Sequence, residues 1–287
     1  MTRASNLFRK MRGNKMIVFS SVILALTVLC GLFAGFLAPF SPYDQALENK
    51  LKPPFFTDES RQQIHVLGTD QLGRDVLSRV IYGIRVSLLI GILAVAISAV
   101  FGVVLGLIAG YYGGIFDDVI MRLADVQLSI PLILLAISVI IVLGSSIQVL
   151  ITVIGLTQWM GYARMVRGQA LSLREKDFVK SAYAVGASDL RVISRYIFPN
   201  TLSSVTVLIT LNMATVIVLE AGLSFLGLGI QPPEPSLGTM LSESTSYLSS
   251  AWWLSTFPGL TIMVIILAIN LFGDGLRDVL DPRLENY

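Results

Sequence analysis

Long apolar stretches dominate the pattern of hydrophobic and polar positions along this chain. A helix needs about 20 mostly apolar residues to cross about 30 Å of membrane hydrocarbon. Six stretches meet this requirement, and they cover residues 16–38, 86–110, 126–144, 147–166, 201–222 and 254–273. The pattern therefore predicts an all-α polytopic membrane protein with about six transmembrane helices.

Composition and the placement of positive charge extend this prediction. The 287 residues are 54% hydrophobic and 14% charged, whereas an ordinary soluble domain is about a quarter charged. Lys and Arg number seven in residues 161–199, none in 223–253, and five in the N-terminal tail, namely Arg3, Arg9, Lys10, Arg12 and Lys15. Because cytosolic loops carry an excess of positive residues, we expect both termini and the 167–199 loop to be cytosolic.

The segment before the second span has a two-sided pattern. Apolar side chains recur at helical spacing from Leu72 to Ser87, while the other face carries Arg74, Asp75, Ser78, Arg79 and Arg85. This pattern is typical of a helix that lies along the membrane interface. We therefore divide the chain into residues 1–85, with a basic tail, the first span and an external loop with an interfacial helix, and residues 86–287, a core of five spans.

Three glycines in the second span are spaced four residues apart, at Gly102, Gly106 and Gly110. Each glycine costs a helix up to about 1 kcal/mol relative to alanine. A stripe of glycines lets a second helix backbone approach closely. The spacing therefore predicts a helix-packing face.

Several kinds of catalytic chemistry are excluded by missing motifs. The chain has no Gly-Lys dipeptide, so it lacks the phosphate-binding loop that an ATPase of that class needs. It has one histidine, His65, one cysteine, Cys30, and no Gly-x-Ser-x-Gly sequence, which argues against a metal cluster or a nucleophile–histidine pair. We expect a non-catalytic subunit that binds no cofactor or metal itself, and the net charge of +2 gives no indication of a nucleic-acid partner.

The basic segment between the fourth and fifth spans has a helix–turn–helix pattern. It predicts a helix from about Glu175 to Val185, a break at Gly186, and a second helix that begins after Ser188 and ends at Pro199. We call residues 175–199 the knob. Small residues at Ser181, Ala182 and Ala184 would let the knob fit a groove on a partner. From periodicity alone, a plain basic loop that only enforces topology is an equal alternative.

Polar residues inside the spans are candidates for a substrate pathway. Glu220 lies late in the fifth span, where it could line the path, pair with a partner subunit, or cap the helix near the outer interface. Asn212 and Gln158 are interior amides, for which hydrogen bonds between helices are at least as good an explanation as substrate contact.

The motifs of the whole chain together resemble one family. The run Ser181–Ala182–x3–Gly186–x10–Ile197–x–Pro199 is similar to the Glu-Ala-Ala loop of permeases in ATP-binding-cassette importers, with Lys180 where the family commonly has glutamate. Further matches are Gly68–Thr69–Asp70, Gly73–Arg74–Asp75, Arg85–Val86–Ser87–Leu88, Gly222–Leu223–Ser224–Phe225–Leu226–Gly227–Leu228–Gly229, Gln231–Pro232–Pro233 and Gly273–Asp274–x2–Arg277–Asp278–x2–Asp281–Pro282–Arg283, while Leu237 replaces the usual tryptophan. The chain thus resembles the C-type permease of dipeptide, oligopeptide and nickel importers.

The resemblance implies a type I importer core in a bacterial inner membrane, with a cytosolic coupling helix in residues 171–199. The coupling residues it implies are Lys180, Ser181, Ala182, Gly186, Ala187, Ser188 and Pro199. It implies four kinds of partner: a second homologous permease, two cytosolic ATPases that bind ATP and Mg²⁺, an extracytoplasmic substrate-binding protein, and membrane lipid. Di- or oligopeptides are the expected cargo, and a nickel or metal chelate is the alternative. A secondary transporter driven by an ion gradient is the alternative of another class.

Overall fold

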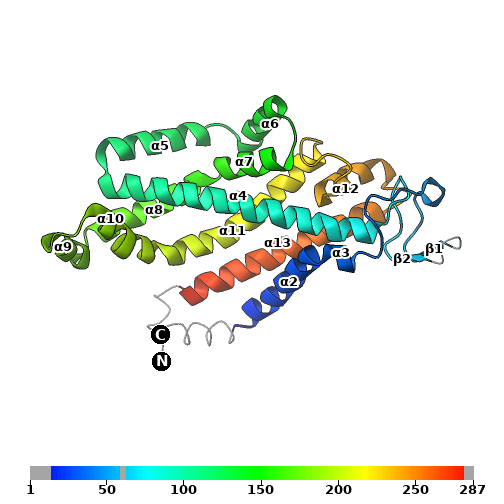
Figure 1. Ribbon diagram of the computed structural model, residues 1–287, viewed down its shortest axis with the longest axis horizontal. Coiled ribbons are helices and arrows are strands. Elements are labelled where there is room, and N and C mark those ends of the chain that lie inside the picture. The colour runs from blue at the N-terminus through cyan, green and yellow to red at the C-terminus, as the bar shows by residue number, and fades with distance from the viewer. Residues whose placement is uncertain (1–13, 59–62, 281–287) are drawn as a thin grey trace.

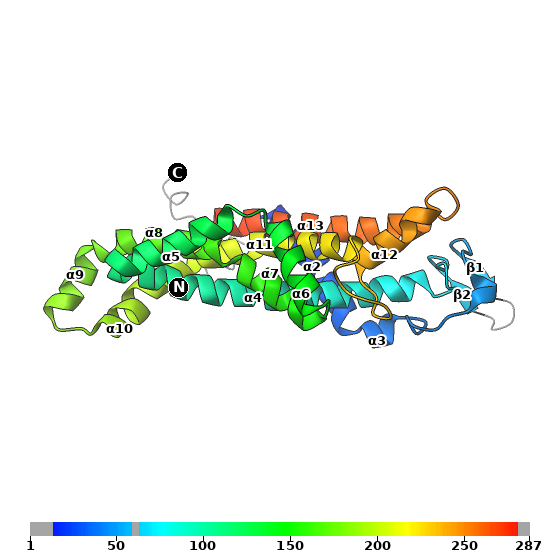
Figure 2. The ribbon, with the colours of Figure 1, turned by 90° about the horizontal axis from the view of Figure 1, so that it is seen from above.

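The computed structural model describes residues 14–58 and 63–280 as an elongated bundle of helices (Figures 1 and 2). The Asp281–Pro282–Arg283 motif and four of the five basic residues of the N-terminal tail lie outside the described residues. The helices are α2 (Lys15–Leu32), α3 (Ala34–Leu37), α4 (Val76–Tyr112), α5 (Gly114–Leu128), α6 (Leu132–Leu143), α7 (Ile147–Thr157), α8 (Trp159–Arg174), α9 (Asp177–Ala184), α10 (Asp189–Val192), α11 (Phe198–Phe225), α12 (Leu237–Ser244) and α13 (Trp253–Leu280).

Short elements complete the chain. They are the 3₁₀ turns η1 (Leu47–Asn49) and η3 (Thr245–Tyr247), the π-helical segment η2 (Ile193–Ile197), and the strands β1 (Phe56–Asp58) and β2 (Gln63–His65). The two strands form an antiparallel hairpin in which Phe56 pairs with His65. The hairpin lies at one end of the molecule and the α9–α10 knob at the other, and α4 runs between them (Figure 1).

Five helical segments of the described residues are long and apolar enough to span a membrane: Lys15–Leu32, Val76–Tyr112, Ile147–Arg174, Asp189–Phe225 and Trp253–Leu280. A sixth span is possible if α5 and α6 count as one, although they are bent by 88° relative to each other. The predicted all-α architecture of about six spans is confirmed. The prediction of a straight third span over residues 126–144 is wrong, because the chain turns at Ser129–Pro131.

The second span is longer than the apolar pattern indicates. The predicted interfacial helix forms the first turns of α4, which is continuous for 37 residues. Asp75 caps the helix by accepting hydrogen bonds from the Ser78 backbone N–H at 2.7 Å and the Ser78 hydroxyl at 2.8 Å. Arg74, Arg79 and Ser78 are buried rather than solvated, so most of the polar face that indicated an interfacial helix lies inside the protein, while Arg85 is exposed.

α4 and α8 pack with their backbones in close contact along the glycine stripe. A Cβ placed on Gly102 would lie 2.3 Å from the Trp159 carbonyl oxygen, and one on Gly106 would lie 2.6 Å from the Ala163 carbonyl oxygen. At Gly110 it would lie 2.7 Å from both the Ala170 Cβ and the Arg167 carbonyl oxygen. No side chain fits at these three positions without moving one of the helices.

Gly106→Ala should therefore destabilise the protein by about 1–3 kcal/mol, the usual cost of overpacking a tight interior. Gly168→Ala is the matched control, because Gly168 lies in α8 with nothing within 4 Å of an added Cβ; it should be neutral or stabilising by up to about 1 kcal/mol. Thermal unfolding midpoints of the two purified variants in detergent make the comparison. Equal midpoints would show that the α4–α8 contact is not tight.

Candidate functional site

The knob begins with α9 and turns sharply at Gly186. Gly186 has a φ of +84°, in the left-handed region that glycine adopts without strain. Its N–H donates to the Tyr183 carbonyl at 2.8 Å, and the Ala187 N–H donates to the Ala182 carbonyl at 3.0 Å. These two bonds form the Schellman ending of an α-helix. The turn that the sequence places at Gly186 is therefore present, and its cause is local backbone geometry.

One face of the knob packs on its own chain. Val179 and Val192 are fully buried, and Ala182 is 9% exposed. They join a core cluster with residues of α4, α8 and α11, among them Val103 and Val166. Ala182 therefore faces inward and fixes α9 against the spans, and of the three small residues only Ser181 and Ala184 are exposed.

Other side chains of the knob, which flank this buried face, are large, apolar and exposed. Phe178 is 45% exposed, Leu190 is 74% exposed, and Val185 beside Gly186 is 89% exposed. The exposed residues around them include Lys180 and Arg191. These three apolar residues were not predicted as a surface from the sequence, although the knob has more apolar positions than one buried face can hold. An exposed apolar surface rimmed by charge is typical of a protein-binding site.

The remaining coupling residues implied by the resemblance differ in their exposure and contacts. Lys180 Nζ lies 3.2 Å from Glu175 Oε2, and its hydrogen bond and charge hold the pKa of Glu175 below its ordinary value. Ser181 is exposed, Ala187 is partly buried, and Ser188 occupies the N-cap position of α10 without a side-chain capping bond. Pro199 does not stop a helix as predicted, because it lies in the first turn of α11, where its missing N–H is not needed.

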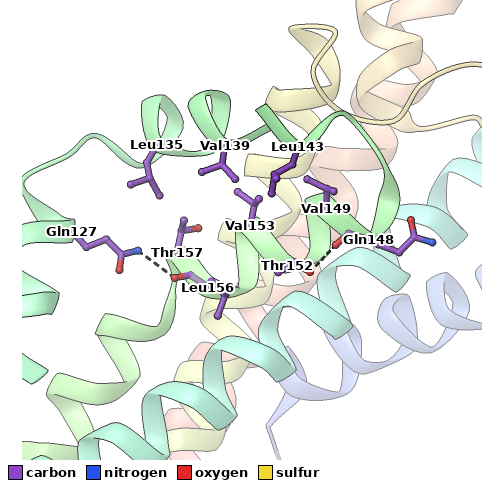
Figure 3. A pocket seen from close by; sticks show the side chains of 10 residues that line it. All are labelled: Gln127, Leu135, Val139, Leu143, Gln148, Val149, Thr152, Val153, Leu156 and Thr157. Atoms are coloured by element: carbon purple, nitrogen blue, oxygen red, sulfur yellow. Dashed lines mark hydrogen bonds between the residues drawn. The ribbon is translucent and has the colours of Figure 1, made fainter. Parts of the chain in front are cut away.

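A mostly apolar pocket of about 510 Å³ lies between α6 and α7. Leu135, Val139 and Leu143 of α6 face Val153 of α7 across it (Figure 3). Gln127 of α5 lies at one edge, where it donates to the Leu156 carbonyl at 3.3 Å and accepts from Trp159 Nε1 at 2.8 Å. Gln148, Val149, Thr152, Leu156 and Thr157 complete the lining. The pocket could take a small molecule with apolar groups and a few polar ones.

The three polar residues proposed for a substrate pathway do not line this pocket. Glu220 is fully buried and accepts hydrogen bonds from the hydroxyl of Ser87 at 2.9 Å and of Ser224 at 2.8 Å. It thus joins α11 to α4 inside this chain. Asn212 approaches the Tyr162 hydroxyl on α8. Gln158 lies at the break between α7 and α8, and its Nε2 has no hydrogen-bond partner among the described residues.

A buried charge cluster holds the hairpin end together. Asp70 Oδ2 lies 2.6 Å from Arg74 Nε and 2.5 Å from Arg79 Nη1. Glu243 of α12 lies 2.9 Å from Arg79 Nη1 and 3.1 Å from Arg74 Nη2. We call Asp70, Arg74, Arg79 and Glu243 the hairpin-end charge cluster. Burial acts to raise the pKa of Glu243, but the charge and hydrogen bond of Arg79, with Gln71 and Arg74, outweigh it and hold this pKa below its ordinary value.

The sequence matches two family models. Residues 102–286 match the model described as the binding-protein-dependent transport system inner membrane component, which is more than half of the chain. The chain belongs to this permease family. Residues 2–54 of the permease match the N-terminal transmembrane domain of oligopeptide transport permease C.

Curated relatives align with the permease over nearly its whole length. It is 41% identical to the di/tripeptide transport system permease protein DppC of Pseudomonas aeruginosa, over 95% of this chain and 90% of that protein. It is 42% identical to the glutathione transport system permease protein GsiD of Escherichia coli, over 97% of this chain and 90% of that protein. The family predicted from the sequence is therefore confirmed.

Solved structures share the fold of the permease. A chain of the MetNI methionine ABC transporter in inward-facing conformations aligns with a TM-score of 0.58 at 18% identity, over 71% of this chain and 97% of that chain. A chain of an amino acid ABC transporter aligns with a TM-score of 0.54 at 13% identity, over 70% and 94% of the two chains. The likeness confirms the predicted importer-permease fold.

Substitution of Gly186 should loosen the knob according to how well the new residue adopts a left-handed backbone. Gly186→Val should cost the turn about 1–2 kcal/mol, whereas Gly186→Asn should cost less because asparagine visits that conformation. An added Cβ meets no atom of another part of the chain within 4 Å, so the cost comes from the local backbone conformation alone. Limited proteolysis of the knob in membranes should cut the Val variant faster. Equal cutting of the two variants would contradict this account of the turn.

The hairpin-end charge cluster should weaken in acid. Because the pKa of Glu243 is lowered in the folded permease, its contribution to stability is complete above the ordinary glutamate pKa of about 4.3 and is lost as pH falls through the lowered value. Glu243→Gln should therefore flatten the fall of the thermal unfolding midpoint between about pH 5 and pH 3. Glu48→Gln, at an exposed position of the same end, should leave that slope unchanged. Identical slopes for the wild type and Glu243→Gln would refute the assignment.

Proposed function

We propose that this permease is one half of the translocation pathway of an ATP-driven importer of short peptides. The proposal that transport is driven by ATP rests on the exposed apolar side chains of the knob. These are Phe178, Val185 and Leu190. A soluble partner that binds this surface can transmit work to the spans, because the other face of the knob is packed into their core. The relatives named for di/tripeptide and glutathione transport support peptides as the cargo.

The proposed assembly has the partners expected for such an importer. A second, homologous permease completes the pathway, two ATPases bind ATP and Mg²⁺ on the cytosolic side, and an extracytoplasmic binding protein delivers the peptide. The knob end is cytosolic in this proposal. α2 begins and α13 ends on the side of the molecule toward the knob (Figure 1), so this orientation also places both termini in the cytosol. Lys and Arg are concentrated in residues 161–199, as expected for a cytosolic loop.

The pocket between α6 and α7 is the proposed part of the peptide path within this subunit. Its lining combines apolar side chains with the amides and hydroxyls of Gln127, Gln148, Thr152 and Thr157. Such a lining suits a cargo whose backbone is polar and whose side chains vary. Glu220 has a different role in this proposal, because its carboxylate is occupied by Ser87 and Ser224.

Uptake by the complete complex in proteoliposomes tests the proposal. Labelled dipeptide should accumulate when ATP is supplied, should stop accumulating when ATP is removed with ion gradients intact, and should be unaffected when those gradients are collapsed. Unlabelled di- and tripeptides should compete, whereas free amino acids and a nickel chelate should not. Uptake that persists without ATP and stops with the gradients would reject the importer in favour of a secondary transporter.

A further inference from the structure

The last turn of α4 is joined to the knob by a chain of hydrogen bonds. The Tyr183 hydroxyl of α9 donates to the Tyr111 hydroxyl of α4, which in turn donates to Asp189 Oδ1 of α10 at 2.7 Å. The Tyr111 and Tyr183 rings are stacked, with centroids 6.4 Å apart and planes 19° apart. Tyr111 is only 5% exposed. One buried hydroxyl therefore bonds to both short helices of the knob.

The same turn of α4 is also bonded to α8. Arg174 Nη1 in the last turn of α8 donates to the Tyr111 backbone carbonyl at 3.0 Å. Tyr111 therefore contacts α8, α9 and α10 by hydrogen bonds. We call Tyr111, Arg174, Tyr183 and Asp189 the Tyr111 cluster. Any displacement of the knob must either move the end of α4 or break these bonds.

α4 is suited to carry such a displacement along the molecule. Its 37 residues form an unbroken helix without proline, about 55 Å long at 1.5 Å per residue. At its far end Arg79 bonds to Asp70 and to Glu243 of α12. The Tyr111 cluster and the hairpin-end charge cluster therefore lie at opposite ends of one helix.

The route from the knob through α11 is less regular. α10 continues into the π-helical segment Ile193–Ile197 and then into the first turn of α11, which contains Pro199. A π-helical segment is a usual site at which a helix bends. Motion that enters α11 can be absorbed there, whereas α4 has no such segment.

We propose that Tyr111 is a positioning residue that transmits movement of the knob into α4 during the transport cycle. This inference rests on the proposed function. The Tyr111 ring lies between the end of α4 and the knob. Its hydroxyl accepts a hydrogen bond from Tyr183 of α9 and donates one to Asp189 of α10, so it fixes the position of both short helices relative to α4. Loss of the hydroxyl leaves the knob packed on α4 but removes the hydrogen bonds that make α9 and α10 move with it.

The test uses the complete complex with its ATPases and binding protein in proteoliposomes, and measures dipeptide transported per ATP hydrolysed. Tyr111→Phe should lower this ratio about ten-fold, the scale of one lost charge-assisted hydrogen bond, while ATP hydrolysis continues. Asp189→Ala should give the same defect, and the double variant should be no worse than either single one, because both remove the same bond. Asp189→Asn keeps an acceptor for the Tyr111 hydroxyl and should restore most of the ratio.

Tyr112→Phe is the matched control, because Tyr112 is the neighbouring residue and is 49% exposed. It should leave the ratio unchanged. An unchanged ratio in both Tyr111→Phe and Asp189→Ala, or an equal fall in Tyr112→Phe, would overturn the role of Tyr111. Thermal unfolding of each variant complex excludes loss of assembly as the cause.

A cross-link separates failure of this inference from failure of the proposed function. Cys30 is the only cysteine of the chain, so Val185→Cys in a Cys30→Ala background provides one reactive thiol at the knob tip. Cross-linking of this thiol to an ATPase, combined with a normal transport ratio in Tyr111→Phe, would reject the role of Tyr111 and retain the importer. Absence of any cross-link, together with uptake that needs no ATP, would reject the importer itself.

Discussion

The close contact between the backbones of α4 and α8 is the constraint on which the other features depend. Lipid offers no hydrophobic driving force between helices, so their association needs tight packing and polar contacts. Gly102, Gly106 and Gly110 supply the packing, since their missing side chains let α8 approach α4. α8 leads directly into the knob and α4 leads to the hairpin end, so this contact fixes both functional ends of the bundle relative to each other.

Polar contacts then attach the remaining elements to this pair of helices. Arg167 and Arg164 of α8 bond to Asp117 and Asp125 of α5, respectively. At the hairpin end, two arginines and two carboxylates of the charge cluster are nearly all buried. Removal of one partner from such a cluster leaves an uncompensated buried charge. The segment before α4 and the helix α12 are therefore bound to α4 as one unit, although they are far apart in the sequence.

The sequence predicted correctly those features of the fold that depend on residues close together in the chain. The number of spans, the turn at Gly186 and the glycine stripe each follow from a few neighbouring residues. The burial of Arg74 and Arg79 could not be predicted in this way, because only Asp70 lies near them in the sequence and their other partner, Glu243, lies more than 160 residues away. For the same reason Glu220 seemed available to a substrate, whereas Ser87, on another span, occupies its carboxylate.

Other wrong or missed predictions concern features that the sequence itself could have indicated. Apolar residues continue from 126 to 144, which indicated one straight span, yet Pro131 disfavours a helical conformation at the residue before it and the chain turns there by 88°. The face of Ala182 was assigned from its size, whereas its contacts with residues of the spans decide that it is buried. Phe178, Val185 and Leu190 were not singled out, because only the small residues of the knob were considered as a surface for a partner.

The tightly packed helices of this structure are distinct from the places where its helices are bent or irregular. α4 and α8 form a tightly packed pair, whereas α5 and α6 are bent by 88° relative to each other and the helix that leads into α11 contains a π-helical segment. Alternating access requires packed units that move between discrete arrangements rather than a bundle that deforms evenly. The pocket lies where these parts meet, because its walls come from α6 on one side and α7 on the other. A change in the angle between α5 and α6 would therefore change the volume of this pocket without altering the α4–α8 contact.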